Sequence, residues 1–177
     1  MTSSKQEAQW ALRAQSGDRE ALELLLRGVL PALRRYVGGL AGPERSDDVL
    51  QDVLLTVCRK LVWLREPLAF RAWAYRIASR AVFRQLKKER NRREEPVDES
   101  VLEEVPAQGV AADVAAELVD LDGLPAASRA VLTLHFREEM TLPEVAAVLE
   151  IPLGTVKSRL AYGLNAIRRQ LGTRRNT

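Results

Sequence analysis

The stretch that decides the fold is Thr141–Leu160, "TLPEVAAVLEIPLGTVKSRL". Thr141 and Glu144 have the spacing of a helix-capping box, and the proline between them fits a first helical turn because its missing N–H costs little there. After this short helix we expect a tight turn, shaped by Pro152 and Gly154, that leads into a second helix. The pattern is typical of a helix–turn–helix, whose second helix can enter the major groove of DNA.

The second helix has one apolar and one polar face when its residues are placed at intervals of about 100°. The apolar face, which must pack on the rest of the domain, consists of Val156, Leu160, Leu164, Ile167 and Leu171. The opposite face is polar and basic, and no acidic residue occurs from Ile151 to the C-terminus. Lys and Arg side chains reach phosphates and guanine, and hydroxyl groups bond base edges or phosphates. The candidate DNA-binding residues are therefore Thr155, Lys157, Ser158, Arg159 and Tyr162.

The rest of the chain also has helical periodicity, so the predicted fold class is all-α. Asp18 is a good N-cap for a first long helix, in which Pro31 should cause a kink or a fresh start. A second helix should be capped by Ser46 or Asp47, and a third should cover about residues 70–90. The sequence has no sustained period-two alternation and no hairpin turn signal, which argues against a β-sheet.

The single cysteine, Cys58, excludes a disulfide within the chain and fits a reducing compartment. It lies in an apolar helical pattern, which favours burial as a small hydrophobic residue. The N-terminus lacks an apolar signal segment, and no run of eighteen apolar residues occurs. We therefore expect a cytoplasmic protein that does not insert into a membrane.

Charge divides the 177-residue chain into three blocks. Residues 1–93 carry 19 Lys and Arg against 10 Asp and Glu, whereas residues 94–123 carry 10 acidic residues and no basic ones. Residues 124–177 carry 8 basic and 4 acidic residues. Within the acidic block, residues 94–112 have the composition of a flexible linker. We predict two small helical domains, 1–93 and 113–177, that bind a polyanion and are joined by a linker that avoids it.

Basic residues follow aromatic ones near the end of the first domain, with Glu89 as the one acid among them. Such a surface suits single-stranded nucleic acid, because bases stack on rings while the backbone meets positive charge. Trp73 also has helical spacing from Phe70 and Ile77, which is typical of a core position. The candidate residues for this second nucleic-acid contact are Trp73, Tyr75, Arg76, Arg80, Arg84, Lys87 and Lys88.

Five motifs between about Glu7 and Leu171 carry a family resemblance: "GDREALELLL", "DDVLQDVLLTV", "FRAWAYRIASRAVFRQLKKERNRR", "LPAASRAVLTLHF" and "EVAAVLEIPLGTVKSRL". With them the chain resembles the extracytoplasmic-function (ECF) group of bacterial RNA polymerase sigma factors. The last motif is highly specific in combination with the second and third. A piece like "GTVKSRL" on its own is also similar to the helix–turn–helix domains of response regulators.

The resemblance implies a non-catalytic specificity subunit that works only with core RNA polymerase. The first domain would recognise and melt the −10 promoter element with its aromatic and basic residues, and the second would read the −35 element with its helix–turn–helix. An anti-sigma factor is the further partner that the family implies. The residues implied in core binding are Asp47, Asp48, Gln51, Asp52 and Thr56. This acidic patch is unsuited to DNA in its own right and suits a protein partner.

Two departures from the family bear on promoter specificity. The family usually has Asn and Asp at the positions of Arg80 and Arg84, and the arginines favour phosphate contact over base readout. The family commonly has two further arginines where this chain has Tyr162 and Leu164. We expect promoter preferences that differ from those of better-known members.

Two other classes of function fit parts of the sequence. A stand-alone helix–turn–helix regulator would bind DNA without polymerase, but it leaves "DDVLQDVLLTV" and the linker unexplained. An enzyme is disfavoured because the sequence has one histidine, His135, which lies in an apolar helical pattern and reads as structural. The sequence also lacks a phosphate-binding glycine loop and a metal-spaced cluster. We therefore expect no catalytic residues, cofactor, metal ion or small-molecule substrate.

Overall fold

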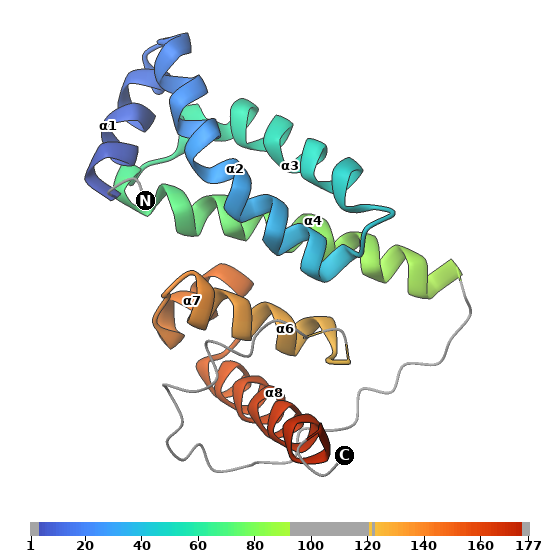
Figure 1. Ribbon diagram of the computed structural model, residues 1–177. Helices are drawn as coiled ribbons and strands as arrows, with labels where there is room; N and C mark the ends of the chain where they lie inside the picture. Colours follow the sequence, from blue (N-terminus) through green and yellow to red (C-terminus); the bar gives the residue numbers. More distant parts are fainter. Residues whose placement is uncertain (1–3, 93–120, 122, 175–177) are drawn as a thin grey trace. The chain divides into compact units, whose positions relative to one another are not determined.

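The structure is a computed structural model that describes residues 4–92, 121 and 123–174 (Figure 1). The chain divides into two compact units, Met1–Glu94 and Glu95–Thr177. Every regular element among the described residues is helical, which confirms the all-α prediction. The linker predicted at residues 94–112 lies outside the described residues.

The first unit is built around one long helix, α2, which packs against the other three α-helices (Figure 1). The elements are α1 (Ser4–Gln15), α2 (Arg19–Ala41), α3 (Ser46–Lys60), the 3₁₀ helices η1 (Leu61–Trp63) and η2 (Pro67–Ala69), and α4 (Phe70–Arg92). Their apolar faces meet in one core, whose fully buried members include Leu25, Val29, Leu33, Val53, Val57 and Phe70. Removal of these side chains from water is the main force that holds the four helices together.

Helix α2 begins as predicted and continues further than predicted. The Oδ1 atom of its N-cap, Asp18, accepts the backbone N–H of Ala21 at 3.0 Å, and this bond lowers the pKa of Asp18. The helix then runs without interruption through Pro31, so the expected fresh start is wrong. Proline has no N–H, so the carbonyl of Arg27, four residues earlier, has lost its helical partner. Arg27 and Pro31 are both exposed, and water can bond this carbonyl instead.

Helix α3 differs from its prediction in two respects. Arg45 occupies the N-cap position without a side-chain cap, and Ser46 is the first helical residue, its Oγ donating to the carbonyl of Pro43 at 3.3 Å. Cys58 is exposed, so its predicted burial is wrong. It lies about 100° around the helix from Val57 and thus off the buried face. That face consists of Val49, Leu50, Val53 and Val57.

A pair of tyrosines lies at the centre of the first unit. Tyr36 and Tyr75 are 1% and 0% exposed, and their rings meet edge to face with centroids 5.2 Å apart. The Ser79 hydroxyl donates to the carbonyl of Tyr75 at 2.8 Å, so the hydroxyl of Tyr36 donates to Ser79 Oγ, 2.7 Å away. These contacts join α2 to α4, and burial raises the pKa of Tyr36.

The second unit consists of α6 (Ala126–Leu132), the π-helical turn η3 (Thr133–Arg137), α7 (Leu142–Leu149) and α8 (Leu153–Arg174). Both α6 and α7 pack against α8. Val156, Leu160 and Ile167 are buried, as predicted for this face of α8, and Leu164 is half-buried. The predicted fifth member, Leu171, has a side chain that lies outside those described. The helices approach closely at Gly163, where a Cβ atom would lie 2.7 Å from Cδ1 of the buried Leu132.

The turn between α7 and α8 is made by Glu150. This residue has φ 56° and ψ 43°, the left-handed conformation, and its N–H donates to the carbonyl of Ala146. Gly154 lies in the first turn of α8, where its φ is not positive and nothing lies within 4 Å of a Cβ built on it. The expectation that Gly154 shapes the turn is therefore wrong, because the reversal is complete before α8 begins.

Replacing Tyr36 with Phe tests the buried tyrosine pair. The variant keeps the ring packing but removes the hydroxyl bonded to Ser79, so we expect the first unit to lose about 1 kcal/mol of unfolding free energy at pH 7. Above the ordinary tyrosine pKa of 10.0, the unfolded wild-type chain ionises Tyr36 while the folded chain keeps it protonated. The unfolding free energy of the wild type therefore falls as pH rises above 10.0, and its difference from that of Tyr36→Phe should become smaller. Urea titrations below and above pH 10.0 measure this difference in unfolding free energy, and a difference that does not change with pH would contradict the prediction.

Replacing Glu150 with Gly should stabilise the second unit by about 0.5–1 kcal/mol, because glycine adopts the left-handed conformation without steric cost. Native-state hydrogen exchange of the α7 and α8 amides measures the change. Ala147→Gly is the matched control, since Ala147 is exposed in the regular part of α7 and the same replacement there should destabilise by about 1 kcal/mol. A loss of protection in both variants would show that the conformation of Glu150 is not strained.

Candidate nucleic-acid and protein interfaces

The first turns of α8 present the predicted DNA-binding side chains away from the buried face. Lys157 is exposed, Tyr162 is 36% exposed, and Thr155 and Ser158 are half-buried. The Ser158 hydroxyl donates to the carbonyl of Thr155 at 3.1 Å. Its oxygen lone pairs can therefore accept a hydrogen bond from the amino group of a base.

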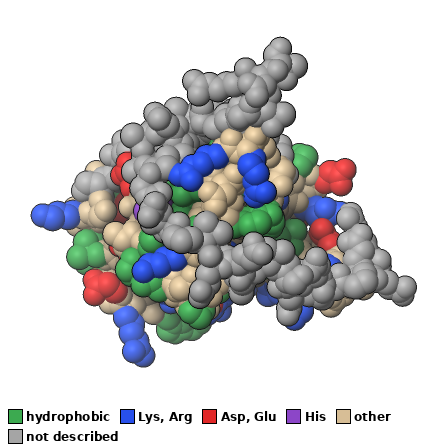
Figure 2. Space-filling model, turned by 90° about the horizontal axis from the view of Figure 1, so that it is seen from below, with side chains coloured by type: hydrophobic (Ala, Val, Ile, Leu, Met, Phe, Trp, Pro, Cys, Tyr) green, Lys and Arg blue, Asp and Glu red, His purple; other side chains and the backbone are tan. Residues whose placement is uncertain are grey.

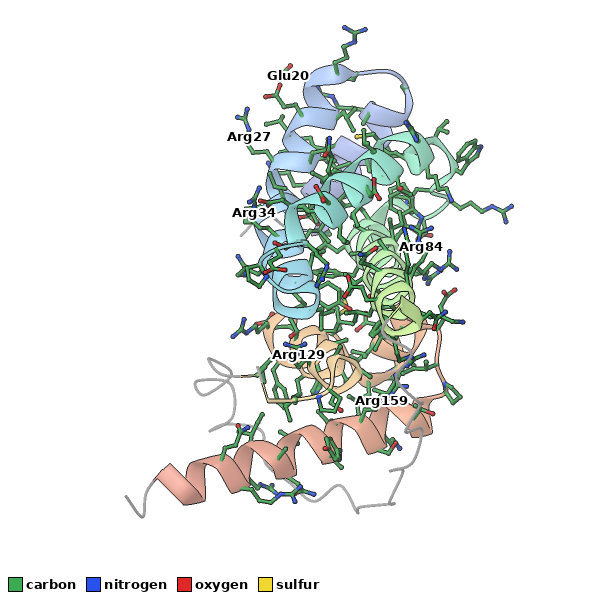
Figure 3. All side chains as sticks on the ribbon, turned by 90° about the vertical axis from the view of Figure 1, so that its right-hand side faces the viewer. Glu20, Arg27, Arg34, Arg84, Arg129 and Arg159 are labelled. Carbon is green, nitrogen blue, oxygen red and sulfur yellow. The ribbon has the colours of Figure 1, made fainter. Side chains whose placement is uncertain are left out.

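Arg159 follows Ser158 in the second turn of α8 and is labelled in Figure 3. Its side chain is half-buried, and this burial lowers the pKa of the guanidinium, which still remains charged at neutral pH. Lys157 is therefore the exposed cation of the first two turns.

The polar face of α8 continues beyond the residues singled out from the sequence. Asn165 and Arg169 follow Tyr162 on the same face, Arg168 lies on the flank next to Asn165, and both arginines are exposed. Arg168 donates to Asn165 Oδ1 at 3.2 Å, and Arg169 Nε donates to the backbone carbonyl of Asn165 at 3.4 Å. Figure 2 shows Lys and Arg side chains exposed at the centre of one face of the molecule. The helical period of the sequence already places Asn165 and Arg169 opposite the apolar stripe, although neither is among the candidate DNA-binding residues.

The helix before α8 is fixed at its start by the predicted capping box. Glu144 Oε2 accepts the backbone N–H of Thr141 at 2.8 Å, and Thr141 Oγ1 accepts the N–H of Glu144 at 3.4 Å. The bonds with Thr141 lower the pKa of Glu144. His135 Nδ1 hydrogen-bonds the carbonyl of Met140 at 2.7 Å, just before this cap, in agreement with its predicted structural role.

The predicted basic residues of α4 lie mainly on its surface. Arg76 is half-buried, and the others are exposed, with Arg84 directed away from the helix in Figure 3. The acid of this segment, Glu89, bonds Arg45 at 2.7 Å and Gln85 at 2.8 Å. Its carboxylate is therefore directed toward the turn before α3. The exposed basic residues are Arg80, Arg84, Lys87 and Lys88.

The two aromatic residues predicted to contact nucleic acid differ in accessibility. Trp73 is half-buried, and its ring centroid lies 6.2 Å from that of Phe70. Tyr75 is completely buried against Tyr36, so no base can stack on its ring. The prediction of Tyr75 as a DNA-binding residue is therefore wrong, because its position turns it toward the core.

The residues of α3 implied in core binding form an exposed, mainly acidic row. Asp47, Asp48, Gln51 and Asp52 are exposed, and Asp47 bonds Arg34 at 3.2 Å. Thr56 is half-buried and donates to the backbone carbonyl of Asp52 at 2.7 Å. Leu55, which sequence reasoning did not single out, is 44% exposed beside these acids. A carboxylate row with an exposed leucine can bind a basic and partly apolar protein surface.

Across the described parts of both units, every helix is too short or too polar to cross a membrane.

Comparison with known proteins links both units to sigma-70 factors. Residues 23–92 match the family model "Sigma-70 region 2", and residues 121–169 match "Sigma-70, region 4". Both models describe parts of transcription initiation factors, and neither describes an enzyme.

Relatives align along most of the chain. The RNA polymerase sigma-H factor of Pseudomonas aeruginosa is 29% identical over 97% of this chain and 96% of its own length. The ECF RNA polymerase sigma-E factor of Escherichia coli is 28% identical over 88% of each chain. The ECF RNA polymerase sigma factor SigW of Bacillus subtilis is 26% identical over 75% of this chain and 78% of its own.

Two solved structures share the fold. CnrH, in complex with the cytosolic domain of CnrY, has a TM-score of 0.67 and 23% identity, covering 95% of this chain and 98% of CnrH. The sigma factor RpoE of Bartonella quintana, in complex with the anti-sigma factor NepR, has a TM-score of 0.65 and 24% identity, covering 85% of this chain and 96% of RpoE. With both sigma-70 regions matched in order and ECF relatives aligned along the chain, the protein belongs to the extracytoplasmic-function group of RNA polymerase sigma factors.

Proposed function

We propose that this ECF sigma factor brings core RNA polymerase to its promoters through three surfaces with separate partners. The acidic row of α3 binds core polymerase. The exposed basic residues of α4 bind the −10 element and help to open it. The outer face of α8, from Thr155 to Arg169, binds the −35 element.

The observation that carries this proposal is the separation of charge by helix. The exposed row of α3 consists of Asp47, Asp48, Gln51 and Asp52, whereas the exposed row of α4 consists of Arg80, Arg84, Lys87 and Lys88. Helix α8 has no acidic residue along its length. A polyanion is attracted to α4 and α8 and repelled by α3, so one domain can hold polymerase and DNA on different faces.

The −10 contact proposed for α4 relies on charge more than on base recognition. Arginine at positions 80 and 84 has no acceptor group, so it suits phosphates and guanine and cannot accept a hydrogen bond from a base. Half-buried Trp73 supplies the aromatic surface on which an unpaired base can stack. Tyr75 takes no part in this contact because it is buried.

An anti-sigma factor is the regulatory partner that we propose for this chain. The solved relatives CnrH and RpoE are bound to the cytosolic domain of CnrY and to the anti-sigma factor NepR. We place the action of the protein in the cytoplasm, where core polymerase works.

Mixing the protein with core polymerase tests the function directly. We expect the two to co-purify and to start transcription at a promoter, whereas a stand-alone regulator would bind promoter DNA tightly without polymerase.

Asp52→Lys should weaken core affinity tenfold or more, since it places a cation among carboxylates that face a basic partner. Glu20→Lys, an equal charge change at an exposed residue of α2 (Figure 3), should leave core affinity within about twofold. Equal losses in both variants would rule out the α3 row as the core contact.

Replacing Lys157 with Ala tests the α8 surface. Loss of one exposed cation should weaken binding of the holoenzyme to a −35 duplex roughly tenfold, with core affinity unchanged. The slope of log affinity against log salt concentration, the salt slope, should become shallower by about one. Lys5→Ala removes the same charge from exposed α1 and serves as the control. Arg159→Ala should have a similar but smaller effect on the salt slope, because Arg159 is half-buried. If core affinity falls with promoter affinity, the assignment of this face to DNA is wrong.

A further inference from the structure

Helix α1 precedes the residues matched to the sigma-70 region 2 model, which begin at residue 23. Two of its polar side chains nevertheless bind the segment that connects α3 to α4. This connecting segment, residues 61–71, contains η1, η2 and the first residues of α4. It therefore joins the helix proposed to bind core polymerase to the helix proposed to bind the −10 element.

Gln15, at the end of α1, bridges both ends of η1. Its Nε2 donates to the carbonyl of Leu61 at 2.9 Å and to the carbonyl of Leu64 at 2.7 Å. The carbonyl of Leu61 also accepts the N–H of Leu64 at 3.0 Å, which closes the 3₁₀ turn. The turn therefore directs these carbonyls toward α1, while Val62 and Trp63 are 60% and 71% exposed. One amide group thus fixes how this connection presents its apolar side chains.

Glu7, near the start of α1, holds the other end of the same segment. Arg71 Nε donates to both carboxylate oxygens of Glu7 at 3.0 Å, and Arg71 Nη2 donates to Oε1 at 2.9 Å. Glu7 is only 3% exposed, and Arg71 lies in the first turn of α4, close in sequence to Trp73. A forked contact fixes orientation as well as distance. The buried carboxylate also makes any displacement of Arg71 costly.

We propose that α1 is a positioning element for promoter opening, with Gln15 and Glu7 as positioning residues that hold residues 61–71 in the conformation that separates the strands of the −10 element. The proposal rests on the proposed function, because it takes α4 as the −10 helix. Apolar contacts already hold α1 on the fold, since Ala8 and Ala11 are buried and α1 packs along α2. The polar bonds add to this packing because they set the geometry of the connection between α3 and α4. A connection that is already in the required conformation lowers the free-energy cost of separating the strands.

Gln15→Met tests the proposal, since methionine has nearly the same length and apolar stem but no donor for the two carbonyls. Gln9→Met is the matched control, because Gln9 is exposed on the same helix. Wild-type protein and both variants are assembled with core polymerase, and core affinity is measured first. Opening is then followed by the fluorescence of 2-aminopurine placed in the −10 element of a duplex promoter. Transcription is measured in parallel on a promoter whose −10 element is already melted by mismatches.

We expect Gln15→Met to slow or reduce opening of the duplex promoter roughly five- to tenfold, because it removes two hydrogen bonds, each of small net value. Core affinity and transcription from the premelted promoter should stay within about twofold of the Gln9→Met values, because core binding precedes the opening step and the premelted promoter bypasses it. The test leaves the Glu7–Arg71 pair intact, so it does not depend on the folding of a variant with a buried unpaired charge.

Three results would overturn the proposal: opening equal to that of Gln9→Met, a matching loss on the premelted promoter, or a fall in core affinity as large as the fall in opening. The last result would show that α1 acts only through stability. Failure of wild-type protein to bind core polymerase is a different outcome, which would overturn the proposed function itself.

Discussion

The burial of one face of α2 is the constraint on which the first unit depends. Helices α1, α3 and α4 all pack against it, and its Tyr36 is bonded through Ser79 to α4. Because α1, α3 and α4 all pack on α2, each of these three helices has an outer face of its own. The charge of that outer face can differ from helix to helix without affecting the shared core. This arrangement lets a small unit present a carboxylate row and a basic row without placing either in the interior.

In both units, polar side-chain contacts fix the backbone at points where helices begin, end or are connected. In the second unit, the capping box sets the start of α7, and the left-handed Glu150 ends it, so the entry into α8 is defined on both sides. In the first unit, Gln15 and Glu7 set the connection between α3 and α4. Each contact uses one or two side chains at a point where the backbone changes direction, where apolar packing alone specifies little.

Local signals in the sequence predicted much of the fold and part of the candidate site. The Asp18 cap, the Thr141 capping box and the buried face of α8 depend on neighbours within a few residues, and all three are confirmed. The assignments of individual residues to DNA or polymerase stay predictions. Sequence spacing placed Tyr75 and Cys58 incorrectly, because a difference of one residue turns a side chain about 100° around the helix.

Contacts between distant residues could not be predicted from the sequence. Glu7 and Arg71 are 64 positions apart, and Gln15 lies 46 positions from Leu61. Neither pair has a local signature, and a glutamate or glutamine on a helix usually faces solvent. The course of α2 through Pro31 is also a tertiary effect, because packing of the helix on both sides of the proline outweighs one lost hydrogen bond.

The lack of acidic residues in α8 has a consequence for the search for promoters. Cations that approach DNA release its condensed counterions, so a helix without carboxylates gains attraction at any sequence before a specific base is read. Such attraction speeds encounter and weakens steeply as salt rises. Ionic strength would then set how long the protein stays on non-promoter DNA, and the base recognition proposed for the outer face of α8 would decide at which sequence it remains.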